Sequence, residues 1–199
     1  LLYSEGPNTE DCDLITITSP LGVMKKTHQI LTKKTRDIDK KLLNNLEKVG
    51  FKLEYGEDET GWQFKYLTRG GGYYFNVGAS DLIADKKIKV IQHSDISDFT
   101  STGLKLENGE EISADLIVTA TGYKGQGYVV EKLFGKDVND KIGPIWGFDK
   151  QTQELRNMWM KTKQPGLWFH AGSLAQCRIF SKFLALQIKA VQKGLISHN

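Results

Sequence analysis

Two short segments combine glycine with residues that could lie against a bound ligand. Each follows an apolar run typical of a buried strand: Asp115 to Ala120 leads into Thr121-Gly122-Tyr123, and 166–171 lead into Gly172-Ser173. A glycine at the carboxyl end of such a strand lets the backbone approach a ligand closely. The second segment continues through 174–178 into a helix, whose first N–H groups and dipole favour an electron-rich ligand atom. An ordinary α/β turn uses glycine in the same way, and the residues alone favour that interpretation.

The sequence motifs give little support for phosphate binding, nucleophilic catalysis or metal binding. The run Arg69-Gly70-Gly71-Gly72-Tyr73-Tyr74-Phe75 matches G-x-G-x-x-G for three positions, then has Phe75 where the third glycine belongs. It also precedes an expected strand instead of opening a helix. The chain has no Walker-type Gly-Lys-Ser/Thr, no G-x-S-x-G nucleophile motif and no spacing typical of a metal site.

The remaining polar candidates have simpler interpretations. His170 stands in an apolar run, so a core histidine is expected there and not a general base. Asp95 and Asp98 lie in a Ser-Asp-Ile-Ser-Asp run that favours capping or turn chemistry. Cys12 and Cys177 are far apart and match no metal spacing, which predicts a reducing compartment and no structural disulfide.

The sequence pattern predicts helices in the first fifty residues and strands in the middle of the chain. Between Leu21 and Lys52 apolar residues recur at helical spacing, so the nine Lys or Arg of this stretch are expected on solvated faces. Gly50 is expected to end the second helix with a positive φ. A nucleic-acid or membrane patch is the less favoured interpretation of the same lysines.

The strands expected in the middle have alternating aromatic and β-branched residues: 51–55, 62–66, 74–77, 87–92 and 103–107. Asn108-Gly109 predicts a hairpin turn, so these strands should form a small antiparallel meander. The apolar runs 115–120 and 166–171 instead predict strands covered on both faces of a parallel sheet. A helix carrying Leu184, Ile188, Val191 and Leu195 on one stripe follows the second run, and 125–164 are expected as a long irregular excursion.

Composition limits the class of protein. The 199 residues are 39% hydrophobic and 26% charged with a net charge of +3, which excludes a disordered tail, a fibre and a disulfide scaffold and argues against a nucleic-acid partner. No apolar run approaches the roughly 18 residues of a transmembrane segment. The chain begins Leu1-Leu2-Tyr3 without Met or a signal peptide, so we expect a cytoplasmic protein of which this is a fragment.

The segment from Asn108 to Tyr123 resembles the part of two-dinucleotide-domain flavoproteins that leaves the NAD(P)-binding domain. Its ending Ala-Thr-Gly-Tyr is similar to a signature of flavin-containing monooxygenases. The similarity continues, in order, through four further blocks: Gly50-Phe51, the Arg69-Gly-Gly-Gly-Tyr-Tyr run, Val77-Gly-Ala-Ser80 and Arg178-Ile-Phe-Ser-Lys-Phe-Leu-Ala-Leu-Gln-Ile-Lys189. Together these blocks resemble the carboxyl-terminal part of fungal and bacterial members and cover most of the chain.

The resemblance implies an oxidoreductase. In the family, NADPH reduces bound FAD, O2 adds to the reduced flavin to give a hydroperoxyflavin, and one oxygen atom is transferred to a small-molecule substrate at nitrogen, sulfur or a carbonyl. It implies an α/β fold, namely a partial two-dinucleotide-binding-domain flavoprotein fold, Rossmann-like, with the antiparallel β-meander. Family members carry glycine fingerprints for FAD and for NADPH that this chain lacks, so the chain alone is expected to be inactive and to hold FAD weakly or not at all.

The resemblance also assigns segments and residues. It implies that 1–77 are the remainder of the NAD(P)-binding domain, 78–119 the β-meander and return strand, and 120–199 the carboxyl-terminal part of the FAD-binding domain. Seven residues are implied to bind cofactor, with a helix from about Ser181 directed at the flavin: Ala120, Thr121, Gly122, Tyr123, Gly172, Gln176 and Arg178. Arg178 could equally form a structural salt bridge. No catalytic residue is implied, and a homo-oligomer is left open.

Two alternatives stay open. A flavin-dependent pyridine-nucleotide reductase of the same fold shares the Asp-x-apolar-Ala-Thr-Gly pattern, although Tyr123 and the Arg178 block favour the monooxygenase. A non-catalytic fragment acting through the basic helices of 21–52 would bind nucleic acid or anionic lipid in a strongly salt-dependent manner.

Overall fold

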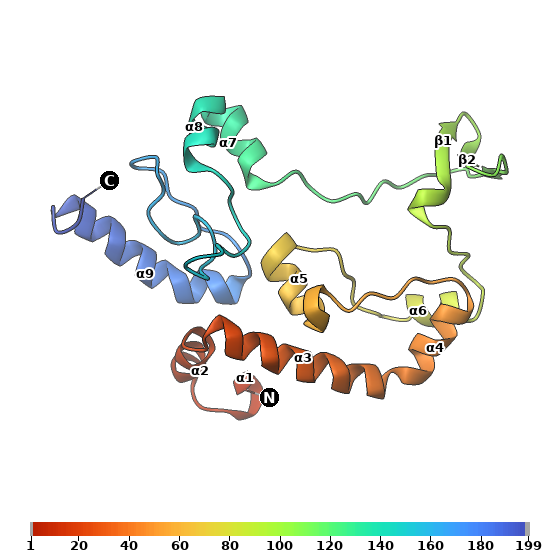
Figure 1. The fold of residues 1–199 in the computed structure, drawn as a ribbon, viewed down its shortest axis with the longest axis horizontal. Coiled ribbons are helices and arrows are strands. Elements are labelled where there is room, and N and C mark those ends of the chain that lie inside the picture. The colour runs from red at the N-terminus through yellow and green to blue at the C-terminus, as the bar shows by residue number, and fades with distance from the viewer. Residues whose placement is uncertain (1, 198–199) are drawn as a thin grey trace. The chain divides into compact units, whose positions relative to one another are not determined.

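The computed structural model describes residues 2–197 and divides into two units, each built from separated stretches of chain. Unit 1 comprises residues 2–33, 55–73 and 124–197, and unit 2 comprises 34–54 and 74–123. Both helices and strands are present, and the sheet is small and antiparallel. The chain is therefore α/β only in the broad sense of a mixed helical and sheet protein (Figure 1).

Helices make up the regular structure of unit 1. They are α1 (Leu2–Glu5), α2 (Thr9–Ile17), most of α3 (Leu21–Ile38), the 3-10 turn η1 (Glu57–Glu59), α5 (Gly61–Arg69), α7 (Gln126–Phe134), α8 (Lys136–Ile142) and α9 (Leu174–Gln192). Gly135, with φ +88°, separates α7 from α8 and allows the two helices to pack together. Among residues 2–197 no helix has the length and apolar character needed to cross a bilayer.

The core of unit 1 forms where α9 packs against the irregular segment that precedes it. Met158, Trp159 and Leu184 are buried there. Trp159 stacks on Phe180 of α9, with ring centroids 4.4 Å apart and planes 17° from parallel. These contacts fix the first half of α9 against the rest of the unit. Partly buried apolar side chains complete the cluster: Ile145, Trp146, Leu155, Trp168, Phe169, Ala171 and Ile188.

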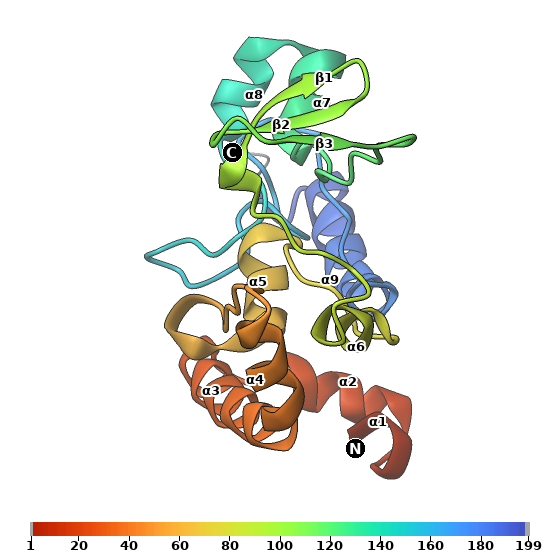
Figure 2. The ribbon, with the colours of Figure 1, turned by 90° about the vertical axis from the view of Figure 1, so that its right-hand side faces the viewer.

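Unit 2 contains α4 (Lys40–Lys48), α6 (Ala79–Ala84), the 3-10 turn η2 (His93–Asp95) and a three-stranded sheet. Strands β1 (Ile96–Thr100), β2 (Gly103–Leu106) and β3 (Glu111–Ser113) lie in that order and pair antiparallel, as Figure 2 shows. Leu46 of α4, Ser80 of α6 and Leu106 of β2 are buried. The Gln92 side chain donates to the carbonyl oxygen of Gly50 at 2.9 Å and so joins two parts of the unit.

Several predictions from local pattern are confirmed. Helices α3 and α4 occupy the expected stretch, and Gly50 follows with φ +85°. Asn108 and Gly109 form the turn between β2 and β3, where the Gly109 N–H donates to Leu106 at 2.9 Å. The predicted hairpin is therefore confirmed over 103–113, whereas β1 covers 96–100, where no strand was predicted and where turn chemistry was expected for Asp98. The last helix is also confirmed, but it begins at Leu174 and not near Ser181. It ends at Gln192, so the prediction for Leu195 is wrong: this residue lies beyond the helix and is 78% exposed.

The other strand predictions are wrong. Residues 62–66 lie in helix α5, and 51–55, 74–77 and 87–92 form no strand. The runs 115–120 and 166–171 are irregular, and Leu116 and Val118 are 79% and 77% exposed. A strand exists only where a second strand accepts its hydrogen bonds, and within residues 2–197 the only paired sheet is β1–β3. His170 is correspondingly exposed and is not a core histidine.

The expected excursion over 125–164 contains more order than its sequence suggested. It holds α7 and α8, followed by a short hairpin bridged at Phe148 and Leu155. Each of the two units gathers stretches distant in sequence, and the predicted segments 1–77, 78–119 and 120–199 stay a prediction. Assignment of those segments to NAD(P)- and FAD-binding domains stays a prediction.

Candidate functional site

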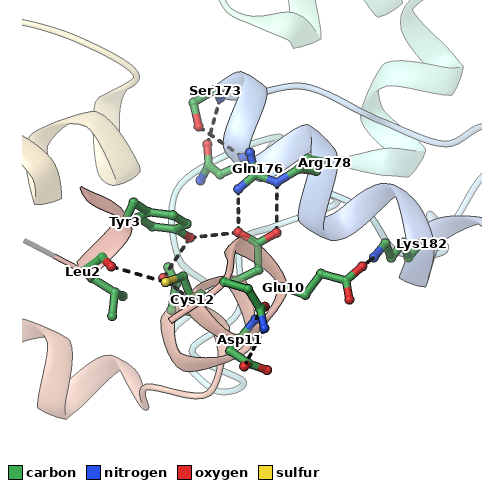
Figure 3. Close-up of polar contacts among 12 residues, drawn as sticks. Leu2, Tyr3, Glu10, Asp11, Cys12, Ser173, Gln176, Arg178 and Lys182 are labelled. Carbon is green, nitrogen blue, oxygen red and sulfur yellow. Dashed lines mark hydrogen bonds and ion pairs between the residues drawn. The ribbon is translucent and has the colours of Figure 1, made fainter. Parts of the chain in front are cut away.

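The amino end of α9 carries a complete capping box. The hydroxyl oxygen of Ser173 accepts the Gln176 backbone N–H at 3.2 Å, while Gln176 Oε1 accepts the Ser173 backbone N–H at 2.9 Å (Figure 3). This reciprocal pair satisfies two backbone donors that a helix end otherwise leaves open. Within residues 2–197 the N–H groups of Leu174 and Ala175 have no protein acceptor, and Leu174 is 90% exposed. These two donors, aided by the helix dipole, are free to bind an electron-rich atom.

Gly172 precedes the helix in a conformation that requires glycine. Its φ is +103°, and a Cβ atom there would lie 2.5 Å from Gln176 Oε1 and 3.3 Å from Trp159 Cζ2. A larger residue would therefore disrupt the capping box and press on the core at once. The glycine expected at this turn is thus explained by close packing within the chain as well as by its φ.

Tyr66 of α5 extends the same hydrogen-bond network. Its hydroxyl donates to Gln176 Oε1 at 2.7 Å. Burial raises the pKa of Tyr66 above its usual value of 10.0, which keeps the hydroxyl protonated and able to donate. Gln176 Oε1 therefore accepts two hydrogen bonds and ties α5 to the start of α9.

Trp159 lies beside this turn with its indole N–H unsatisfied. The side chain is 5% exposed, and Nε1 has no acceptor among the described residues. The backbone at Trp159 adopts φ +55°, which is unusual for a residue with a side chain. A buried donor without a protein partner costs free energy unless a water molecule or another bound atom supplies the acceptor.

Arg178 is held by an acidic partner from α2. Its Nε lies 2.9 Å from Asp13 Oδ2 and its Nη2 2.5 Å from Asp13 Oδ1, a bidentate arrangement (Figure 3). The Tyr3 hydroxyl donates to Asp13 Oδ1 at 2.9 Å. The hydrogen bonds from Arg178 are the main cause that holds the pKa of Asp13 below its usual 3.8. Arg178 is thus a salt-bridge partner in this structure, which was one of its two expected roles.

The predicted contact residues fall into two groups. Gly172, Gln176 and Arg178 come together at the amino end of α9 in unit 1. Ala120, Thr121, Gly122 and Tyr123 belong to unit 2, where they are irregular and exposed, with Tyr123 fully exposed and Gly122 at φ +84°. A shared role of the two groups in binding cofactor stays a prediction.

Three residues of this site were missed from the sequence. Tyr66, Asp13 and Trp159 lie 110, 165 and 21 positions from Gln176, Arg178 and Phe180, which they contact on α9, and no local pattern marks them. One signal was available in principle, because Ser173-x-x-Gln176 is a capping-box sequence and places the helix start at Leu174. Within residues 2–197 no group of His, Cys, Asp and Glu could hold a metal ion, and both Cys12 and Cys177 are free thiols.

Comparison of the chain with models of known protein families and with curated proteins gives no match.

Proposed function

We propose that this chain is the carboxyl-terminal part of an FAD- and NADPH-dependent monooxygenase that oxygenates a small molecule at nitrogen, sulfur or a carbonyl. The observation that carries the proposal is the order of two motifs. The Asp115 to Tyr123 run with its Ala-Thr-Gly-Tyr ending comes first, and the Gly172 turn that opens α9 follows. The proposal includes a Rossmann-like, two-dinucleotide-domain fold for the complete enzyme.

The exposed apolar run supports this fold. Leu116 and Val118 are largely exposed although their types are those of a buried strand. In the complete enzyme this run would join a parallel sheet and lose its contact with water. Burying each such side chain contributes roughly 1.5–3 kcal/mol relative to leaving it exposed.

The amino end of α9 fits one edge of a flavin ring. The free N–H groups of Leu174 and Ala175 would donate to flavin acceptor atoms. Gln176 is already engaged through its Oε1, so its side-chain amide N–H would be the group that faces a cofactor. Arg178 would have to leave Asp13 to reach it. When bound, FAD reduced by NADPH supplies the chemistry that activates O2.

The test is flavin content and NADPH-dependent O2 consumption of the complete gene product. We expect near-stoichiometric flavin in the purified protein and O2 uptake that depends on NADPH and on an amine, sulfide or ketone. A complete protein without flavin would contradict the proposal.

Two matched variants test the role of Arg178 in the same protein. Asp13→Asn breaks the ion pair and leaves the arginine free, whereas Arg178→Gln removes both the ion pair and the cation. If Arg178 contacts flavin, Arg178→Gln loses flavin and Asp13→Asn keeps it. Equal flavin content in both variants would restrict Arg178 to a structural role.

A further inference from the structure

Unit 1 contains a cavity of about 370 Å³ that the proposed flavin chemistry does not use. It lies between the first turns of α3, the stretch from η1 through α5, and the hairpin that contains Phe148 and Leu155. Its apolar wall is formed by Phe64, which is 6% exposed, and Phe148, with ring centroids 6.2 Å apart. The volume is near the lower end of the roughly 300–1,000 Å³ of small-molecule pockets, which favours a compact ligand.

In the described part of the chain, most charged side chains around this cavity have an ion-pair partner, but one does not. Lys25 forms an ion pair with Asp58, and Glu57 pairs with Arg69, whose Nη2 lies 3.0 Å from Glu57 Oε1. Arg156 also lines the cavity, and among the described residues it has no carboxylate partner within ion-pair distance. The unneutralised charge of the cavity wall is therefore the guanidinium of Arg156.

Asp149 is the acidic neighbour of Arg156 on the same hairpin, but its carboxylate is occupied. Asp149 Oδ1 accepts the backbone N–H groups of Gln151 and Thr152, both at 2.9 Å. These hydrogen bonds, more than Arg156, hold the pKa of Asp149 below its usual 3.8. The carboxylate thus belongs to its own turn and leaves Arg156 available.

Arg156 is held in place by the hairpin. Its backbone N–H donates to Gly147 at 2.9 Å, and its carbonyl oxygen accepts the Trp146 N–H at 3.0 Å. Its Nε donates to the Trp146 carbonyl oxygen at 3.0 Å. Since arginine has five N–H donors, four remain on the two terminal nitrogens.

Gly147 makes room for this guanidinium. A Cβ at Gly147 would lie 2.7 Å from Arg156 Nη2 and 3.2 Å from the Thr68 carbonyl oxygen. The cavity wall also holds two non-glycine residues with positive φ, Asp58 at 54° and Gln153 at 62°. Such conformations persist where the surrounding structure enforces them, and they are frequent at ligand sites.

We propose that this cavity binds a small monocarboxylate with an apolar body, anchored by Arg156. A carboxylate matches the planar fork of the guanidinium and accepts two parallel hydrogen bonds from it. The apolar body lies against Phe64 and Phe148. A monocarboxylate carries one negative charge, which Arg156 balances, whereas a multiply charged anion such as phosphate would keep further charge unbalanced because Lys25 and Arg69 are already paired.

Phenylacetate and its neutral counterpart phenylacetamide test the proposal without any variant. Ligand-observed NMR titration of the 199-residue chain measures both dissociation constants. We expect phenylacetate to bind with a dissociation constant on the order of 1 mM or tighter. It should bind roughly ten- to hundredfold tighter than the amide, because only the carboxylate makes charge-assisted hydrogen bonds.

Two variants and one control assign the effect to Arg156. Arg156→Gln should remove the preference for the carboxylate, and Arg156→Lys should retain part of it. Lys150→Gln makes the same charge change at an exposed position of the same hairpin and should bind as wild type does. Circular dichroism verifies that each variant folds. The proposal is overturned if the folded chain binds neither probe, if it binds both equally, if Arg156→Gln keeps the preference, or if inorganic phosphate competes better than phenylacetate.

Discussion

The two hydrogen bonds that Gln176 Oε1 accepts predict an unusual order of stability losses among substitutions at the start of α9. At most helix ends the N-cap residue contributes most, and replacing an N-cap serine with alanine costs about 1 kcal/mol. Here Gln176 Oε1 accepts two hydrogen bonds, from the Ser173 N–H at 2.9 Å and the Tyr66 hydroxyl at 2.7 Å. Each contributes roughly 0.5–1.5 kcal/mol. We therefore expect Gln176→Ala to lower the free energy of unfolding by about 2 kcal/mol and Ser173→Ala by about 1 kcal/mol.

Urea denaturation followed by circular dichroism measures both changes. In a thermal melt the difference corresponds to a further fall in Tm of about 2–4 °C for Gln176→Ala in a chain of this size. Tyr66→Phe supplies the matched control, because it removes one of the two hydrogen bonds and leaves the helix sequence intact. In a Tyr66→Phe background, Gln176→Ala should cost about 1 kcal/mol less than in wild type.

Two results would refute this reasoning. One is a Ser173→Ala variant that loses as much stability as Gln176→Ala. The other is strict additivity of Tyr66→Phe and Gln176→Ala, which would mean that the two side chains do not interact in solution.

Three further predictions follow from burial and charge. Burial lowers the pKa of His28 below its usual 6.5, so the unfolded chain takes up a proton at higher pH than the folded chain does. Urea denaturation should therefore show that wild type is less stable at pH 5.5 than at pH 7.5, and that this loss is smaller in His28→Asn. The hydrogen bond from Arg178 lowers the pKa of Asp13, so its stabilisation is present above pH 3.8 and is lost as pH falls further; the Tm of Asp13→Asn should change less than that of wild type between pH 5 and 2.5. A Cβ at Gly103 would lie 1.9 Å from a carbonyl oxygen of β3, so Gly103→Ala should destabilise unit 2 by more than about 1 kcal/mol and speed amide exchange in the sheet, whereas Gly71→Ala, in open space, should not.

Helices with a strong apolar period were predictable from sequence, whereas most of the expected strands, apart from 103–107, do not form. The spacing of apolar residues in α3 and α4 is a local property, and so is the turn at Asn108-Gly109. The aromatic alternation Trp62, Phe64, Tyr66 misled because residues i, i+2 and i+4 are compatible with a helix that buries only the middle one. Gly70, with φ +76°, ends that helix and was the overlooked signal.

The strand predictions over 115–120 and 166–171 depended on a partner that a sequence pattern does not contain. Apolar character indicates that a segment favours burial, but pairing is decided by a second strand. The candidate site shows the same limit. Glycine and the capping box at the start of α9 are readable locally, whereas Tyr66 and Asp13 reach α9 from more than a hundred positions away.

The coding sequence upstream of the Leu1 codon tests the proposed monooxygenase most directly. Our account predicts that the reading frame continues through two G-x-G-x-x-G fingerprints, each placed between a strand-like run and a helix, which supply the FAD and NADPH phosphate sites. A start codon close upstream, with neither fingerprint between it and Leu1, would contradict the account.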